Sequence, residues 1–387
     1  MAHHPVDNHN VDAPDHFQEV LARSRFSNIS RRQVIRGGVG LAALSTIPFL
    51  PGCGGGGDGG ADLDARAKAR GSIKKNDALG FDAIDKSVLD EVVLPAGYKF
   101  NVVHATGDHL DNKLSYSNTG AELDDWSRRI GDHHDGMDLF YIGANGRYTN
   151  RDTGRALLVV NHESSADAHF FHEKGQTSGG SSGKKFSQFG GWDLGVRPEL
   201  EVLKEINHHG VSIVELERQN GKWTYKLNSP YNRRVNGQSP MRISGPAADL
   251  ADIRSFMVTR FDTTGATSRG TLNNCGHGKT PWGTYLGCEE NWAAYFFMPK
   301  GSTAPDEKTV ASRLRYGVAR APLSDSATSG GTQGWHLPDS DTDDDRFARW
   351  DVSVRGATPD LDFRNEPNTF GYNVEIDPLG SGMSVKR

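Results

Sequence analysis

Residues 272–291 read LNNCGHGKTPWGTYLGCEEN, which places two cysteines, several glycines and two adjacent glutamates within one local unit. Residues 283–287 have the pattern of a short β-strand, and Cys288, Glu289 and Glu290 follow it. Few structural requirements call for thiols and paired carboxylates at a strand end. This stretch is therefore the first place to look for chemistry.

A nucleotide-binding loop is one interpretation of this stretch, because Gly278, Lys279 and Thr280 resemble the end of a phosphate-binding loop. Such a loop needs a glycine five positions before Gly278 and a helix after the threonine. Asn273 stands at the first position, and Pro281 follows the threonine. The sequence therefore excludes this interpretation.

Two other interpretations of the stretch stay open on residue types alone. Cys275 and Cys288 flank a hairpin and would form a disulfide in an oxidising compartment. Alternatively, a thiolate and the carboxylate of Glu289 or Glu290 would bind a metal ion, since sulfur suits iron or zinc and carboxylates suit calcium or iron.

The composition of the whole chain narrows the class of protein. It has 387 residues, a formal charge of -5 and a pI near 6.3, with no basic stripe, which argues against a nucleic-acid partner. The hydrophobic fraction is 35% and there are 46 glycines, so we expect a strand-rich and loop-rich globule.

Short apolar runs separated by turn residues indicate an all-β fold, as a barrel, sandwich or propeller. The expected strands are residues 92–94, 99–104, 139–143, 155–161, 211–217, 222–227, 283–287 and 370–378. Asn220 and Gly221 predict a hairpin between two of them. Residues 197–207, with Pro198 near the start, are the clearest helix. No clean blade repeat is visible.

The N-terminal region has the pattern of an export signal. Arg31 and Arg32 precede an apolar run at residues 37–50 that is too short to span a bilayer, which is typical of a twin-arginine signal. Cys53 follows the run and is a candidate lipid anchor, with simple cleavage nearby as the alternative. We expect residues 1–60 to be signal and flexible linker, and residues 61–387 the folded domain.

Further residues capable of binding a metal or a phosphate lie elsewhere. His134 and Asp135 belong to the ligand-rich segment DHHDGMD, and Glu163 lies at the end of an expected strand. Because alternate strand residues share a side, Asn161 would project with Glu163, although such pairs are commonly turn caps. The pair Arg233 and Arg234 would hold a phosphate, or would be solvated surface.

Taken together, these segments resemble the PhoX family of alkaline phosphatases. The matching pieces are the twin-arginine signal, DGM at 135–137, NHE at 161–163, YNRR at 231–234, ISGPAA at 243–248, residues 272–291 and FGYNVEIDP at 370–378. The resemblance implies a six-bladed β-propeller whose central funnel holds Fe3+ and Ca2+ and hydrolyses phosphate monoesters.

The resemblance also implies roles for individual residues. Cys275 would be an iron ligand, and the carboxylates of Glu163, Glu290 and Glu375 would bind metal ions. The same cluster would include Glu289, His134 and Asp135. By residue type, Arg233 and Arg234 are the candidate substrate-binding pair for such an activity. Family members continue beyond the strand at residues 370–378, so we expect a C-terminally truncated chain, an incomplete propeller and reduced activity.

The expected function is that of an exported, periplasmic or extracellular, metal-dependent phosphatase that releases inorganic phosphate from small phosphate monoesters. Its partners would be the twin-arginine translocation machinery and, through Cys53, the membrane surface. The alternative is a non-catalytic exported propeller that serves as a metal-binding or partner-binding scaffold, with Cys275 and Cys288 bridged.

Overall fold

The computed structural model describes residues 81, 83–111, 125–164, 197–299, 302, 306–318, 333–338 and 345–386. The predicted export signal, Cys53 and the glycine-rich linker lie outside these residues. Residues 81 and 83–102 belong to one compact unit, and the described residues from 103 onward belong to another. No helix in the described ranges is both long and apolar enough to cross a membrane.

The described part of the first unit contains no strand. The strand predicted at residues 92–94 is wrong, and the one predicted at 99–104 does not form either. Val92 and Phe100 are 60% and 58% exposed. Strand-forming residue types are insufficient where no neighbouring segment completes a hydrogen-bonded ladder.

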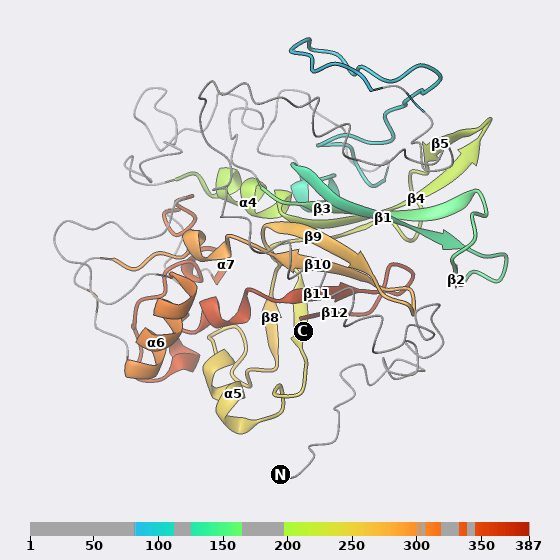
Figure 1. The fold of residues 1–387 in the computed structure, drawn as a ribbon. Helices are drawn as coiled ribbons and strands as arrows, with labels where there is room; N and C mark the ends of the chain where they lie inside the picture. Colours follow the sequence, from blue (N-terminus) through green and yellow to red (C-terminus); the bar gives the residue numbers. More distant parts are fainter. Residues whose placement is uncertain are drawn as a thin grey trace, which may run out of the picture. The chain divides into compact units, whose positions relative to one another are not determined.

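The second unit contains two sheets (Figure 1). The first has the order β2-β1-β3-β4-β5, with β6 also paired to β4, and every pairing is antiparallel. Its strands are β1 (His134–Ile142), β2 (Tyr148–Thr149), β3 (Arg155–His162), β4 (Gly210–Gln219), β5 (Lys222–Tyr225) and β6 (Arg233–Val235). The predicted hairpin between β4 and β5 is confirmed, with positive φ at Asn220 and Gly221.

The second sheet has the order β8-β7-β12-β11-β10-β9. Its strands are β7 (Pro240–Ile243), β8 (Thr267–Arg269), β9 (Asn274–Lys279), β10 (Tyr285–Glu289), β11 (Asn373–Ile376) and β12 (Ser384–Lys386). All pairings are antiparallel except that of β12 with β7. The edge strand β9 lies beside β1 and β3 of the first sheet (Figure 1), so residues distant in sequence meet there.

One apolar core joins the two sheets, and alternation along β4 shows how. Val211 and Ile213 point into a core shared with Tyr285 and Ile376 of the second sheet, whereas Val214 packs into a separate cluster on the other face. Successive strand residues face opposite sides, so β4, which has apolar residues at both odd and even positions, is buried on both faces.

Four α-helices lie in the described part of the second unit. They are α4 (Glu199–His208), α5 (Ala251–Met257), α6 (Glu307–Tyr316) and α7 (Asp345–Ala348). The helix predicted at 197–207 is confirmed as α4, with Pro198 as its N-cap residue. Helix α6 was not predicted, although Asp306 caps its start by accepting from the Thr309 amide and Gly317 ends it at φ 78°. The fold is sheet-rich, as expected; its closure into a propeller stays a prediction.

Candidate metal centre

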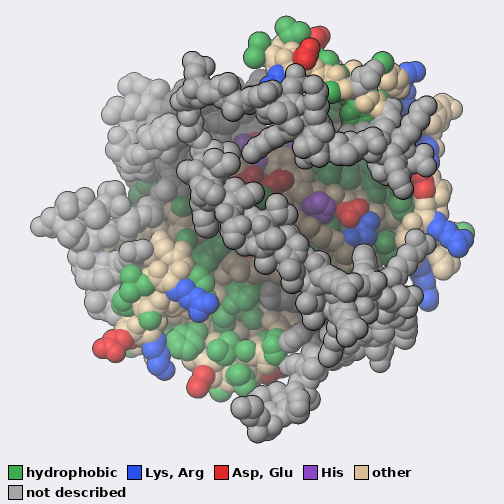
Figure 2. Space-filling view, viewed as in Figure 1, with side chains coloured by type: hydrophobic (Ala, Val, Ile, Leu, Met, Phe, Trp, Pro, Cys, Tyr) green, Lys and Arg blue, Asp and Glu red, His purple; other side chains and the backbone are tan. Residues whose placement is uncertain are grey.

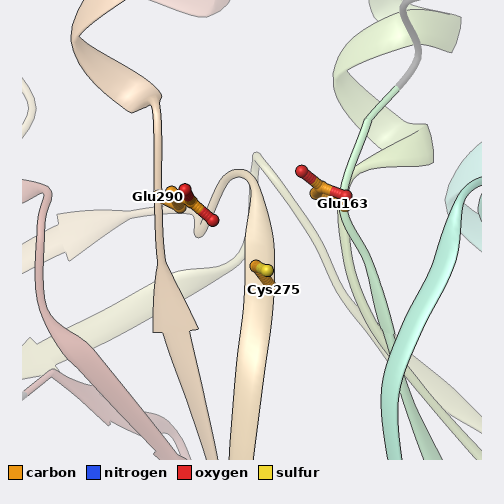
Figure 3. A group of neighbouring side chains, drawn as sticks. All are labelled: Glu163, Cys275 and Glu290. Carbon is orange, nitrogen blue, oxygen red and sulfur yellow. The ribbon is translucent and has the colours of Figure 1, made fainter. Parts of the chain in front are cut away.

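Three predicted ligands come together where the two sheets meet. The ligand atoms of Glu163, Cys275 and Glu290 all lie within 4.8 Å of one another. Glu163 directly follows β3, Cys275 lies in β9, and Glu290 directly follows β10. In Figure 3 the two carboxylates flank the sulfur from opposite sides. The β9–β10 stretch therefore meets the end of β3, which is far from it in the sequence, at one point.

Irregular strand pairing helps to place these side chains. The register of β1 with β3 shifts between His134 and Met137, so Asp135 lies in a bulge. The register of β9 with β10 shifts between Gly287 and Glu289, opposite Cys275. Bulges redirect side chains and are common next to functional sites.

Asp135 adds a third carboxylate beside Cys275. The carboxylates of Asp135, first, and Glu290 raise the pKa of the Cys275 thiol to about 12. Burial, and then the charges of Asp135 and Glu290, raise the pKa of Glu163. When such closely spaced acidic groups ionise, their negative charges repel one another, which helps to raise their pKa values. A bound cation removes that repulsion.

The backbone around the site adopts a sparsely populated conformation. His133, Asn273 and Asn291 have φ values of 47°, 48° and 46°, in the left-handed region. His133 lies two residues before Asp135, Asn273 lies two residues before Cys275, and Asn291 follows Glu290. Such conformations cost free energy in non-glycine residues and cluster at functional sites.

Close packing of β1 on β9 also shapes the site. A Cβ atom at Gly136 would lie 2.6 Å from Nδ1 of His277 and 2.7 Å from the carbonyl oxygen of Cys275. Only glycine allows β1 to approach so closely, which explains the glycine after Asp135. In Figure 2, acidic and histidine side chains gather on this face of the molecule.

The donor set fits a metal centre. One thiol and three carboxylates match the preference of iron for mixed sulfur and oxygen ligands, and the carboxylates also suit calcium. The clustering of Glu163, Cys275 and Glu290 is the observation that favours a cation here. The raised pKa of Cys275 reflects the negative charge around the thiol, which a bound cation would neutralise so that the thiol could bind as its thiolate.

Comparison with known proteins identifies the family. The family described as alkaline phosphatase PhoX matches residues 79–387, which is most of the chain. The chain belongs to the PhoX family. No curated protein matches the chain.

A solved PhoX structure gives a second likeness. Pseudomonas fluorescens PhoX, in complex with vanadate, a transition state analogue, is 31% identical to this chain with a TM-score of 0.60. The match covers 80% of this chain and 44% of the Pseudomonas protein. The chain therefore spans less than half the length of that PhoX.

Glu375, which the PhoX resemblance implies as a ligand, is not one of the three clustered ligands in the described structure. It is 7% exposed on β11, and its Oε1 accepts hydrogen bonds from Nε1 of Trp282 at 2.9 Å and Oγ1 of Thr284 at 2.6 Å. These contacts tie β11 to the turn before β10.

Glu289 is not part of the group either; the neighbouring Glu290 is the glutamate that belongs to it. The carboxylate of Glu289 makes other contacts. Its Oε2 accepts hydrogen bonds from the backbone amides of Gly371 at 2.8 Å and Tyr372 at 3.1 Å. Its Oε1 pairs with Nζ of Lys386 at 2.9 Å. Glu289 thus fixes the end of β10 from inside the protein.

His134 faces other histidines and lies outside the group of three ligands. Its ring centroid is 5.1 Å from that of His104 and 4.9 Å from that of His162. The buried His162 contacts Oγ of Ser212 through Nε2 at 2.9 Å. Burial lowers the pKa of His134 and lowers that of His104 to about 4, so uncharged rings are favoured.

Arg233 contacts backbone carbonyls at the end of β11. Its Nη1 donates to the oxygens of Tyr231 at 3.2 Å and Pro378 at 2.9 Å, and its Nη2 donates to that of Asp377 at 2.6 Å. The guanidinium therefore links β6 to the second sheet.

Arg234 contacts the C-terminus of α4. Its Nη2 donates to the carbonyls of Asn207 and His209, both at 2.9 Å, and its Nη1 donates to that of Arg129. A cation at a helix C-terminus interacts favourably with the helix dipole. Neither arginine joins the Cys275 group in the described structure.

The two cysteines of the opening stretch are both free thiols, so the disulfide interpretation does not describe this structure. Cys288 is exposed, and its Sγ lies 3.2 Å from Oδ1 of Asn373. Gly278 and Lys279 lie within strand β9, which agrees with the exclusion of a phosphate-binding loop.

Proposed function

We propose that this chain binds Fe3+ and Ca2+ and hydrolyses small organic phosphate monoesters, releasing inorganic phosphate. The observation that carries the proposal is the convergence of the Cys275 thiol with the carboxylates of Glu163, Glu290 and Asp135. Membership of an alkaline phosphatase family supports it. So does the likeness to a PhoX that was solved with a transition state analogue.

Each residue has a defined part in this proposal. Cys275 and Glu290 would hold iron, and Glu163 and Asp135 would hold iron or calcium. When bound, these ions supply positive charge for phosphate oxygens and lower the pKa of water. The protein contributes a rigid, partly buried set of ligands, and the Cys275 thiol must release its proton on binding, so metal affinity should rise with pH.

The proposal extends to architecture and location. The two sheets would form part of a six-bladed propeller around the metal centre, with Glu375, Glu289 and His134 in its surroundings. The sequence at residues 1–60 favours twin-arginine export to the periplasm or beyond, with Cys53 as a lipid anchor. Export in the folded state suits a metal loaded in the cytoplasm.

The experiment is elemental analysis for iron and calcium together with hydrolysis of a chromogenic phosphate ester. Cys275→Ala should lose iron and activity together, whereas the matched variant Cys288→Ala should keep both because Cys288 lies outside the group. Iron and activity retained in Cys275→Ala would reject the proposal.

The alternative is a non-catalytic scaffold in which the two cysteines are bridged. A thiol count on anaerobically purified protein separates the two functions. Both Cys275 and Cys288 should react as free thiols after the metal is removed. A Cys275–Cys288 disulfide without bound iron would favour the scaffold.

A further inference from the structure

Asn161 connects β3, which leads to Glu163, with β9, which carries Cys275. It lies in β3, two residues before Glu163, and its side chain is fully buried. Its Nδ2 donates hydrogen bonds to the carbonyl oxygen of Cys275 at 2.8 Å and to that of Gly276 at 3.2 Å. One amide therefore links the strand that leads to Glu163 with the strand that bears the thiol.

These hydrogen bonds occur where β9 lacks regular support. β9 is the edge strand of its sheet, and its pairing with β10 is interrupted opposite Cys275 and Gly276. Buried carbonyl groups need hydrogen-bond partners, and the regular ladder is broken at this point. Asn161 supplies a donor from the neighbouring sheet.

The surroundings leave the amide little freedom. A Cβ atom at Gly287 would lie 3.2 Å from Oδ1 of Asn161, and one at Gly136 would lie 2.7 Å from the Cys275 carbonyl oxygen. Two glycines thus allow backbone to close around the contact. A side chain packed in this way holds one orientation.

We propose that Asn161 is a positioning residue that holds the backbone of Cys275 against β3, so that the thiol faces Glu163. Its importance for a metal rests on the proposed function, whereas its effect on the position of the thiol does not. Without the amide, the bulged segment of β9 loses its tie to β3, and Cys275 becomes more accessible and less well placed.

The test measures iodoacetamide labelling of each cysteine by mass spectrometry in metal-free protein. In Asn161→Ala and in the volume-conserving Asn161→Leu, the Cys275 rate relative to Cys288 should rise about fivefold, the factor expected for losing a hydrogen bond worth ~1 kcal/mol. Cys288 is a suitable internal reference because it is exposed on another strand.

Asn365 offers a matched control. It is 4% exposed, and its Nδ2 donates to the carbonyls of Ser255 at 3.2 Å and Val258 at 3.1 Å, so it makes the same kind of contact elsewhere. Asn365→Ala should lower stability and leave the labelling ratio unchanged. An unchanged ratio in both Asn161 variants, or the same rise in Asn365→Ala, would overturn the proposal.

Iron retention against a chelator is measured on the same variants. Retention should fall in both Asn161 variants and stay at the parental level in Asn365→Ala. If the parent protein itself binds no iron, the proposed function fails, while the labelling ratio still decides whether Asn161 positions the thiol.

Discussion

The Nζ atom of Lys386 lies 2.9 Å from Oε1 of Glu289, and both side chains are fully buried. The same Nζ donates to the carbonyl oxygen of Thr369 at 2.6 Å and lies 4.0 Å from the centroid of the Phe370 ring. The pair therefore joins the last strand of the second sheet to the strand end that precedes Glu290.

Breaking this pair should be strongly destabilising. In Glu289→Ala, Lys386 keeps a buried charge without its partner, and burial already lowers the pKa of that amine. We expect a loss of about 3–5 kcal/mol in the free energy of unfolding, measured by urea denaturation. The double variant Glu289→Gln with Lys386→Met should recover much of the loss. A single variant as stable as the parent would contradict the role of the pair.

Glu163→Gln should stabilise the metal-free protein while weakening its response to calcium. The pKa of Glu163 is raised, so its folded form binds a proton more tightly than its unfolded form, and its charge disfavours folding above pH 4.5. Removing that charge should add up to about 1 kcal/mol at pH 7. The measurement is the melting temperature with a chelator and with added Ca2+.

A matched control for that variant is Glu217→Gln, which removes a carboxylate that pairs with Lys226 at 2.6 Å outside the group. Its calcium response should equal that of the parent. If Glu163→Gln and the parent gain equally from calcium, Glu163 is not a ligand.

The strands that could be predicted best from sequence are those with enough apolar side chains to require a buried position in a sheet. Residues 155–161 and 211–217 are rich in Val, Leu and Ile and become β3 and β4, which pair with each other along their length. Residues 99–104 have similar strand-forming types and form no strand, because pairing depends on a partner that local sequence does not specify.

The candidate site was predictable only in part for the same reason. Cys275 and Glu290 stand in one stretch, whereas their meeting with Glu163 depends on the contact between β3 and β9, which only the family resemblance suggested. For the arginines, the sequence predicts a phosphate contact, whereas the structure shows contacts with backbone carbonyls. Residue type cannot distinguish an arginine that meets a ligand from Arg234, which donates to the carbonyls at the end of α4.

Two glycines with positive φ should respond differently to alanine. Gly210 has φ 104°, and its Cβ would lie 2.1 Å from the carbonyl oxygen of Val235, so backbone would have to move. Gly221 has φ 78° in the hairpin, with no atom within 4 Å of the Cβ position. We expect Gly221→Ala to cost about 1–2 kcal/mol and Gly210→Ala about 3 kcal/mol or more in urea denaturation. Equal losses would show that the β4 to β6 contact is looser than the structure indicates.

Asp262 should make stability depend on acid pH. Burial alone would raise its pKa, but hydrogen bonds from Thr264 and Thr267 outweigh burial and lower it from 3.8 to about 2. Oδ2 accepts from the amide of Ala266 at 2.9 Å as well. Because the folded pKa is depressed, the carboxylate stabilises the fold above pH 4, and this contribution is lost as pH falls from about 4 to about 2. After discounting for solvent screening, we expect about 1–2 kcal/mol, and Asp262→Asn should remove that part of the pH dependence. Urea denaturation of parent and variant between pH 6 and about pH 2 measures it. Parallel pH profiles for the two proteins would show that Asp262 titrates normally.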